Sequence, residues 1–314
     1  MTDIFLSFTD VHAMQWCGVV FFLGAFFLLP SNAKASCAEA AAPVNDFFLP
    51  YYDESGVKIW DARGSSIEIA QGDGALRIRN AYVQFYGREN AGKSLVAMES
   101  ASALLQLHPQ RHISGTEFVH VTGSYFAAMG TRWTFTATDQ SIALEENVQV
   151  FFESNLHTPF STGDKGAAMD HGGAFTAISS EFLLISRCDD ELIFDFLGTV
   201  EVRSDDFSMA CDRLEIHSHS ELYTLAMGKK IPGPCLRNMR AIGQVSIEQN
   251  GHRASADAVE LFPNEGVLVL SGNATLCDEN GSAVAEQLIL RDKERRIVVQ
   301  QSGQERSKIL LDLP

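Results

Sequence analysis

The stretch Gly87 to Ser94, GRENAGKS, has the spacing of a phosphate-binding loop, G-x-x-x-x-G-K-[ST]. Such a loop needs a buried strand before it and a helix after it. The preceding residues, NAYVQFY, alternate between apolar and polar, which is typical of a half-exposed strand. The following residues end in ASALLQL, a phrase that recurs along the chain. We therefore interpret GRENAGKS as a hairpin connection with Lys93 in solvent, and an ATPase is not expected.

Other side chains that often carry chemistry are sparse. His217 and His219 lie two residues apart, so a strand would place both imidazoles on one face as a metal pair. No third ligand stands nearby, and we expect no metal. The acidic pairs Glu145–Glu146 and Asp189–Asp190 are interpreted as turn residues. No hydrolase, zinc-protease or dinucleotide motif is present, so neither catalytic residues nor a cofactor are expected.

Composition and the leader limit the function further. The formal net charge of -16 disfavours nucleic acid as a partner, because phosphate backbones demand Lys and Arg. Cys17 to Leu29 is an apolar run, too short for a membrane span and followed by Pro30. Ala33-Lys34-Ala35 then offers a small-x-small cleavage site. Residues 1–35 are therefore predicted to be a signal peptide, with an uncleaved membrane anchor as the alternative because no basic residue precedes the run.

Export would allow disulfide bonds, since the chain would meet an oxidising compartment. The sequence has no C-x-x-C pair, and it leaves the disulfide pairing open. Unpaired thiols on strands are the alternative. The cysteines concerned are Cys188, Cys211, Cys235 and Cys277.

Two short phrases alternate along the chain and predict its fold. One has the form Ala-x-x-x-Leu-x-Leu, as in ACDRLEI, and the other is Gly-x-Val-x-Val, as in GTVEV and GQVSI. Period-two alternation predicts half-buried strands, and Asn250–Gly251 and Asn280–Gly281 predict hairpin turns. The repeat spacing is too irregular for a parallel β-helix. We predict an all-β, elongated antiparallel fold of two stacked units.

The predicted organisation has four parts. The leader occupies residues 1–35, a first β unit spans 46–153, a linker or long loop spans 154–173, and a second β unit spans 174–314. The linker is inferred from a polar, Gly-rich stretch that interrupts the repeat.

The repeat phrases resemble the OstA/LptA/LptC family of periplasmic lipopolysaccharide-transport proteins. GQVSI, ASADAVEL and LVLSGNATL follow the family pattern in order, and GTVEVRSDDFSMACDRLEI is a second match. The first unit is similar to the LptC member through YYDESGVKIWDARGSSIEI and IRNAYVQFYG. The second unit is more similar to LptA and OstA.

This resemblance implies a twisted, open β-jellyroll that holds the acyl chains of lipopolysaccharide or a similar glycolipid. The protein is expected in the periplasm, exported by its N-terminal signal, with anchoring at the inner membrane as the alternative. The implied partners are other jellyroll transport proteins, joined by pairing of edge strands, and an inner-membrane ABC transporter complex. The expected edge strands are Val57–Ile69 and Arg296–Gln300.

Period-two register predicts which side chains line a lipid groove in the second unit, with Gly272 and Ala274 leaving room. The alternative is a structural envelope scaffold whose core is filled and holds no lipid. The predicted lining consists of Val200, Val202, Leu214, Ile216, Val245, Ile247, Val259, Leu261, Leu268, Leu270, Leu276, Leu288 and Leu290.

Overall fold

The computed structural model describes the chain from residue 43 onward, with gaps. The gaps are residues 71–74, 87–93, 107–111, 154–174, 189–190, 206, 225–229, 264, 280, 292–295, 301–307 and 312–314. For residues 219–224, 230–235, 296, 300 and 308–311 the backbone alone is described. The compact unit that contains all of these strands spans Ala42–Pro314.

The described residues form strands and the turns between them. The strands are β1 (Val44–Tyr52), β2 (Lys58–Ile69), β3 (Leu76–Tyr86), β4 (Ser94–Gln106), β5 (His112–Gly115), β6 (Val119–Gly123), β7 (Phe126–Thr136), β8 (Ser141–Phe152), β9 (Thr176–Ser180), β10 (Phe182–Cys188), β11 (Glu191–Arg203), β12 (Phe207–Thr224), β13 (Lys230–Gln249), β14 (His252–Phe262), β15 (Val267–Asp278), β16 (Gly281–Arg291), β17 (Arg296–Gln300) and β18 (Lys308–Leu311).

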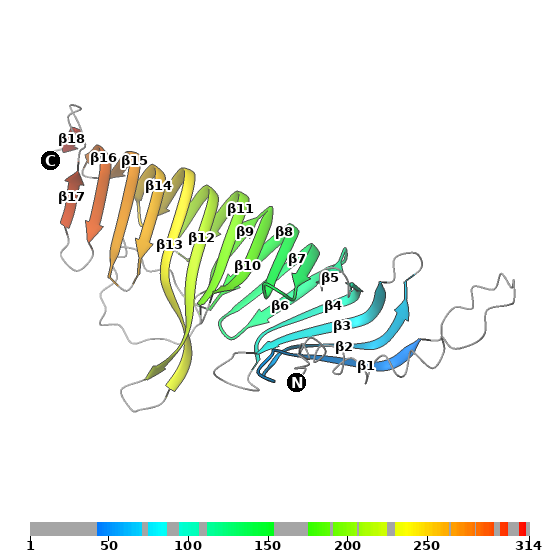
Figure 1. Ribbon diagram of the computed structural model, residues 1–314. Coiled ribbons are helices and arrows are strands. Elements are labelled where there is room, and N and C mark those ends of the chain that lie inside the picture. The colour runs from blue at the N-terminus through cyan, green and yellow to red at the C-terminus, as the bar shows by residue number, and fades with distance from the viewer. Residues whose placement is uncertain are drawn as a thin grey trace, which may run out of the picture. The chain divides into compact units, whose positions relative to one another are not determined.

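The strands follow one another through the sheet in chain order, each antiparallel to the last (Figure 1). In three places of the described sheet, two short strands lie end to end and together occupy one position. β5 and β6 both pair with β4 and β7, and β9 and β10 both pair with β8 and β11. At the far end, β17 and β18 both pair with β16. The all-β, antiparallel prediction is confirmed for the described part of the chain.

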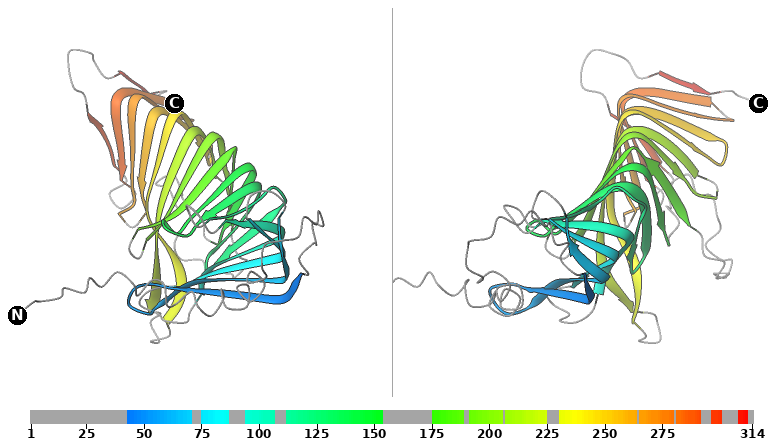
Figure 2. Two further views of the ribbon diagram at one scale, coloured as in Figure 1. Left: turned by 45° about the vertical axis from the view of Figure 1, so that its right-hand side comes forward. Right: turned by 90° about the vertical axis from the view of Figure 1, so that its right-hand side faces the viewer.

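A corner divides the sheet into two wings, and Figure 2 shows the strands arching over it. At this line the backbone register shifts, for example between Ile242 and Val245 in β13 and between Ser271 and Ala274 in β15. Such bulges bend a strand and let both of its halves keep their apolar side chains on the inner face.

We name the wings by the strand segments that pair on each side of the corner. Wing A consists of residues 47–52, 58–64, 81–86, 94–100, 119–123, 126–129, 148–152, 176–180, 200–203, 207–211, 245–249, 252–256, 274–278, 281–285 and 308–311. Wing B consists of residues 44–45, 66–69, 76–79, 102–106, 112–115, 133–136, 141–144, 182–188, 191–197, 213–224, 230–242, 258–262, 267–271, 287–291 and 296–300.

The glycines of the Gly-x-Val phrase make the corner. Gly243 has a φ of 83°, in the left-handed region that glycine adopts without strain. A Cβ atom there would also lie 2.1 Å from Asp212 Oδ2. Asp212, the acidic residue of the Ala-x-x-x-Leu-x-Leu phrase ACDRLEI, therefore occupies the space that a side chain at position 243 would fill. The same arrangement recurs as Gly198 beside Glu181, Gly243 beside Asp212, and Gly272 beside Asp257.

Between the wings lies one continuous apolar cluster that runs from β2 to β16 in the described residues. Its members alternate with exposed residues along each strand. In β13, for example, Val245 and Ile247 are buried while Ser246 and Glu248 are exposed. The alternation read from the sequence thus defines the inner face.

The hairpin turn predicted at Asn250–Gly251 is confirmed. The two residues connect β13 to β14 with φ values of 50° and 81°, as a type I′ turn requires. At the second predicted turn Asn280 lies outside the described residues. The predicted leader at 1–35 and linker at 154–173 also lie outside them.

The prediction that Val57–Ile69 forms the first edge of the sheet was wrong. Val57–Ile69 corresponds to β2, which pairs with β1 on one side and β3 on the other. The outermost described strand at this end is β1. Its sequence contains Pro50, which cannot donate to a ladder and is tolerated in edge strands, and it lacks regular alternation. At the other end β17 pairs with β16, its one partner among the described strands.

Candidate functional site

The predicted lining residues all lie in the interior of the sheet. Each belongs to the continuous buried cluster, with side-chain exposures from 0% at Val200, Leu214 and Leu270 to 7% at Leu276. The period-two spacing thus places these residues of each phrase on the inner side of the sheet. Contact of these residues with lipid stays a prediction.

The two wings bring the predicted residues together from both sides. Val245 and Ile247 come from wing A, whereas Val259 and Leu261 come from wing B. Ala274, expected to leave room for a chain, is buried in this interior. Gly272 does not do so, because it lies at the corner against Asp257.

A small apolar cavity of about 10 Å³ lies between the wings. That volume is near the minimum for one water molecule, and the walls are too apolar to hold one. The predicted lining contains only some of its walls, because Phe207, Met209, Met239 and Ala241 precede the repeat phrases that begin at Ala210 and Gly243. The lining consists of Phe207, Met209, Leu214, Met239, Ala241, Ile247, Val259, Leu261 and Leu268.

The cysteines with described side chains are free thiols at Cys188, Cys211 and Cys277. Cys211 is buried in wing A, and burial together with the charge of Asp212 raises the pKa of its thiol to about 12. It is therefore a small apolar core residue and not a nucleophile. The side chain of Cys235 lies outside the described residues.

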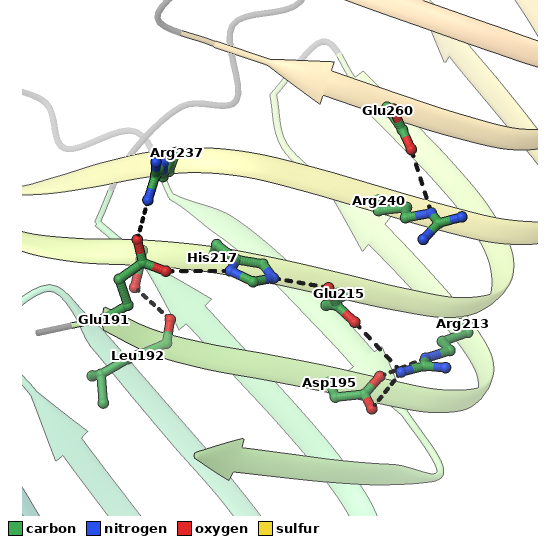
Figure 3. Close-up of polar contacts among 10 residues, drawn as sticks. Glu191, Leu192, Asp195, Arg213, Glu215, His217, Arg237, Arg240 and Glu260 are labelled. Carbon is green, nitrogen blue, oxygen red and sulfur yellow. Dashed lines mark hydrogen bonds and ion pairs between the residues drawn. The ribbon is translucent and has the colours of Figure 1, made fainter. Parts of the chain in front are cut away.

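The outer face of β11 to β14 carries a ladder of charges, drawn in Figure 3. The Nδ1 and Nε2 atoms of His217 lie 3.4 Å from Glu191 Oε2 and 2.8 Å from Glu215 Oε1. Arg213 binds Asp195 through two guanidinium nitrogens at 2.8 and 2.9 Å. Among the described residues no cluster of His, Cys, Asp and Glu could hold a metal ion. The His217 imidazole thus belongs to an ion-pair ladder on the face away from the apolar interior.

The Gly87–Ser94 motif joins two paired strands. Tyr86 at the end of β3 pairs with Ser94 at the start of β4, and β4 is a strand where a phosphate loop requires a helix. The interpretation as a hairpin connection is confirmed by these flanks. Residues 87–93 themselves lie outside the described part of the chain.

The acidic pair Glu145–Glu146 was wrongly assigned to a turn. Both residues lie inside β8 at the corner, where they bind Arg132 at 3.2 and 2.8 Å. Bulged strands expose polar positions in mid-strand, so the sequence at a corner looks like that of a turn. Asp189–Asp190 lies outside the described residues.

A buried carboxylate in wing A was not expected from the sequence. Asp61 is fully buried and is bound by Tyr86 Oη, by Lys58 Nζ at 3.0 Å and by Arg63 Nε at 3.2 Å. Burial raises the pKa of Asp61, but the hydrogen bonds from Tyr86, Lys58 and Arg63 outweigh it and hold the pKa below its usual value. The network is satisfied and structural, as a buried charge must be.

Part of the chain matches a known protein family. Residues 186–296 match the family model described as LptA/(LptD N-terminal domain) LPS transport protein. These residues run from the end of β10 to the start of β17 and include the interior from β12 to β16, in which Phe207 is the one buried aromatic residue that the structure describes. The resemblance drawn from the repeat phrases is therefore confirmed over this stretch. The similarity of the first unit to LptC stays a prediction.

Solved structures that resemble the chain include the crystal structure of LptH, described as the LptA homologous periplasmic component of the conserved lipopolysaccharide transport device from Pseudomonas aeruginosa. The two chains are 13% identical, the match covers 39% of this chain and 84% of that chain, and the TM-score is 0.29. No curated protein sequence matches the chain.

Within the residues that the structure describes, none forms a helix of the length and apolarity that crossing a membrane requires.

Proposed function

We propose that this protein is a non-enzymatic periplasmic carrier that holds the acyl chains of lipopolysaccharide, or of a similar glycolipid, between the wings of its second unit. The observation that carries the proposal is a coincidence in position. The stretch that matches a lipopolysaccharide-transport family, residues 186–296, includes the strands from β12 to β16, where Phe207 is the one buried aromatic residue described and the other buried apolar residues are Val, Leu, Ile, Met, Ala and Cys.

The chemistry of such an interior suits acyl chains. Each buried methylene contributes about 0.8 kcal/mol, so a 12-carbon chain gains up to about 10 kcal/mol on leaving water. A lining of Val, Leu and Ile therefore suffices for binding, and no catalytic group is needed. Transfer between two equivalent grooves would be nearly isoenergetic, so the direction of transport must come from an energy source elsewhere.

A structural scaffold without lipid is the second candidate, and the size of the cavity favours it. Space of about 10 Å³ holds no acyl chain, so a chain must displace side chains or spread the wings as it enters. Two features favour entry. The wings meet at a corner along one side, and Met209 and Met239, which line the cavity, have unbranched side chains that repack readily.

A matched pair of substitutions separates the two candidates. Ile247→Asp places a carboxylate between the wings, whereas Ser246→Asp places it on the exposed outer face of the same strand. Protein purified from its native host would be extracted with organic solvent and its lipids identified by mass spectrometry. The carrier proposal predicts lipid with the wild type and Ser246→Asp, and little with a folded Ile247→Asp. Lipid-free wild-type protein would leave the scaffold as the function.

The proposed partners join at the sheet edges. We expect β1 and β17 to extend the sheet by pairing with other jellyroll transport proteins, and an inner-membrane ABC transporter complex to supply lipid. Adjacent residues of a strand point their N–H groups to opposite sides, so Val298→Pro and Val299→Pro remove donors on opposite edges of β17. One of the two variants should weaken capture of transport partners without loss of stability. Equal capture by both variants and the wild type would exclude pairing at this edge.

A further inference from the structure

Aromatic rings join the two wings in the first part of the sheet. Phe135 of wing B packs against two aromatic residues of wing A. Its ring centroid lies 4.6 Å from that of Phe85 at 84° and 5.8 Å from that of Trp60 at 78°. These are the edge-to-face geometries that aromatic pairs favour. A polar contact also joins the wings here. Arg187 of wing B donates to the carbonyl oxygen of Tyr86 in wing A at 3.3 Å.

A second ring cluster joins β7 and β8 to β11. Phe194 of wing B lies edge-to-face against Phe126 and Phe152 of wing A, with centroids 4.9 and 5.1 Å apart and planes at 84° and 77°. All three rings are at most 3% exposed. We name these residues the Phe194 cluster.

A polar contact lies beside the Phe194 cluster. Tyr125, at the end of wing A, shares a buried hydrogen bond with Ser218 Oγ of wing B, which also donates to Leu192 O at 3.3 Å. Burial raises the pKa of Tyr125 to about 12, so its hydroxyl keeps its proton at any physiological pH. A hydrogen bond in so apolar a place costs much to break, because both hydroxyls would lose their partners without reaching water.

Beyond this point no ring contact joins the wings in the described residues. From β12 onward Phe207 is the one buried aromatic residue that the structure describes, and the other buried apolar residues there are Val, Leu, Ile, Met, Ala and Cys. The cavity between the wings also lies on this side. Aromatic contacts between the wings in the described part of the chain therefore end at the Phe194 cluster.

We infer that the Phe194 cluster and the Tyr125–Ser218 bond close the acyl-chain site on the side of the first unit, so that lipid chains occupy the interior from β12 to β17 and do not continue into the interior of β2 to β8. This inference rests on the proposed function. Interlocked rings leave no path for a chain while the contacts of Phe194 hold them together, whereas aliphatic and Met side chains can move aside.

The test places a photoreactive diazirine amino acid at one of two buried positions. Val245 lies in the interior beyond the cluster, and Val121 lies before it, paired with Ala128 of β7. Each position is labelled in otherwise wild-type protein and in a Phe194→Leu/Ser218→Ala variant, which loses both ring contacts and the hydrogen bond. A Phe196→Leu variant is the control, since Phe196 is equally buried in β11 but lies outside the cluster.

Lipid adducts formed in cells are then measured by mass spectrometry, with folding checked by circular dichroism. We expect adducts at Val245 in every protein, and adducts at Val121 in the Phe194→Leu/Ser218→Ala variant alone. Adducts at Val121 in the wild type would overturn the inference while the proposed function stood. A folded double variant that stays without adduct at Val121 would overturn it as well. Absence of adducts at both positions in the wild type would instead refute the proposed function.

Discussion

The two parts of the sheet share a backbone plan and differ in what fills it. In both, strands bend at a corner and fold two wings over an apolar interior (Figures 1 and 2). From β2 to β11 the wings are joined by rings such as Phe135 and Phe194, and from β12 to β17 the buried apolar residues described are aliphatic, Met or Cys apart from Phe207. We call these the ring-filled region and the aliphatic region.

The comparison teaches that one fold can be made rigid or adaptable by its inward residues alone. Edge-to-face rings fix the distance between wings, whereas branched and unbranched aliphatic side chains tolerate repacking. A carrier needs both properties, since it must hold its shape at its partner and open for its cargo. The predictions below test this division, from the largest expected effect to the smallest.

The largest effect is expected from removing a ring that joins the wings. Phe135→Ala should lower the free energy of unfolding by about 4 kcal/mol, because Trp60 and Phe85 cannot close the space. Phe207→Ala, at the cavity of the aliphatic region, should cost about 3 kcal/mol, since Met209 and Met239 can move in. Urea unfolding of both variants measures the difference. If Phe207→Ala cost as much as Phe135→Ala or more, the aliphatic region would not be the more adaptable one.

The second effect concerns the buried charge of the ring-filled region. Asp61→Asn should lower stability at neutral pH by about 2 kcal/mol, since hydrogen bonds to a charged acceptor are lost. The pKa of Asp61 is lowered in the folded state, so its contribution is present above the unfolded value near 3.9 and is lost as pH falls through the folded value.

Unfolding curves measured at pH 7 and in steps below pH 4, for which the unfolded pKa is about 3.9, test this sign. The stability difference between the wild type and Asp61→Asn should shrink as the pH falls. A difference that grew below pH 4 would show that burial, and not the hydrogen bonds of Tyr86, Lys58 and Arg63, dominates at this site.

The smallest effect concerns the corner that both regions share. Gly243 and Gly251 have φ values of 83° and 81°, so an alanine at either position meets the same backbone strain of about 1–2 kcal/mol. Only Gly243 is covered, by Asp212, whereas nothing lies within 4 Å of a Cβ atom at Gly251. Gly243→Ala should therefore be less stable than Gly251→Ala by a further ~1 kcal/mol in thermal unfolding. Equal stabilities would mean that Asp212 moves aside without cost.

Much of this division could be predicted from the sequence, and its limits have physical causes. Alternation in GQVSI and LVLSGNATL identifies the inner face because period two is a local property of a strand. The strand β1 escaped detection, since Pro50 and irregular polarity conceal an edge strand.

The aromatic contacts that join the two wings could not be predicted from the sequence. Phe126 and Phe194 meet from strands far apart in the chain, and no local pattern specifies which inward residues face one another across two wings. The corner was hidden for a related reason. The bulge in β13 combines Gly243 with the Asp212 carboxylate of the neighbouring strand, and each looks like an ordinary repeat residue alone.

The central claim is that lipid occupies the aliphatic interior, and a photoreactive residue at Leu270 tests it most directly. Leu270 is fully buried between the wings, and its neighbour Val269 lies on the opposite face of β15 and provides the matched control. Irradiated in cells, the exported and folded protein should form a lipopolysaccharide adduct from Leu270 and none from Val269. A folded, exported protein that captured no lipid from Leu270 would contradict the account and leave the aliphatic interior as a closed core.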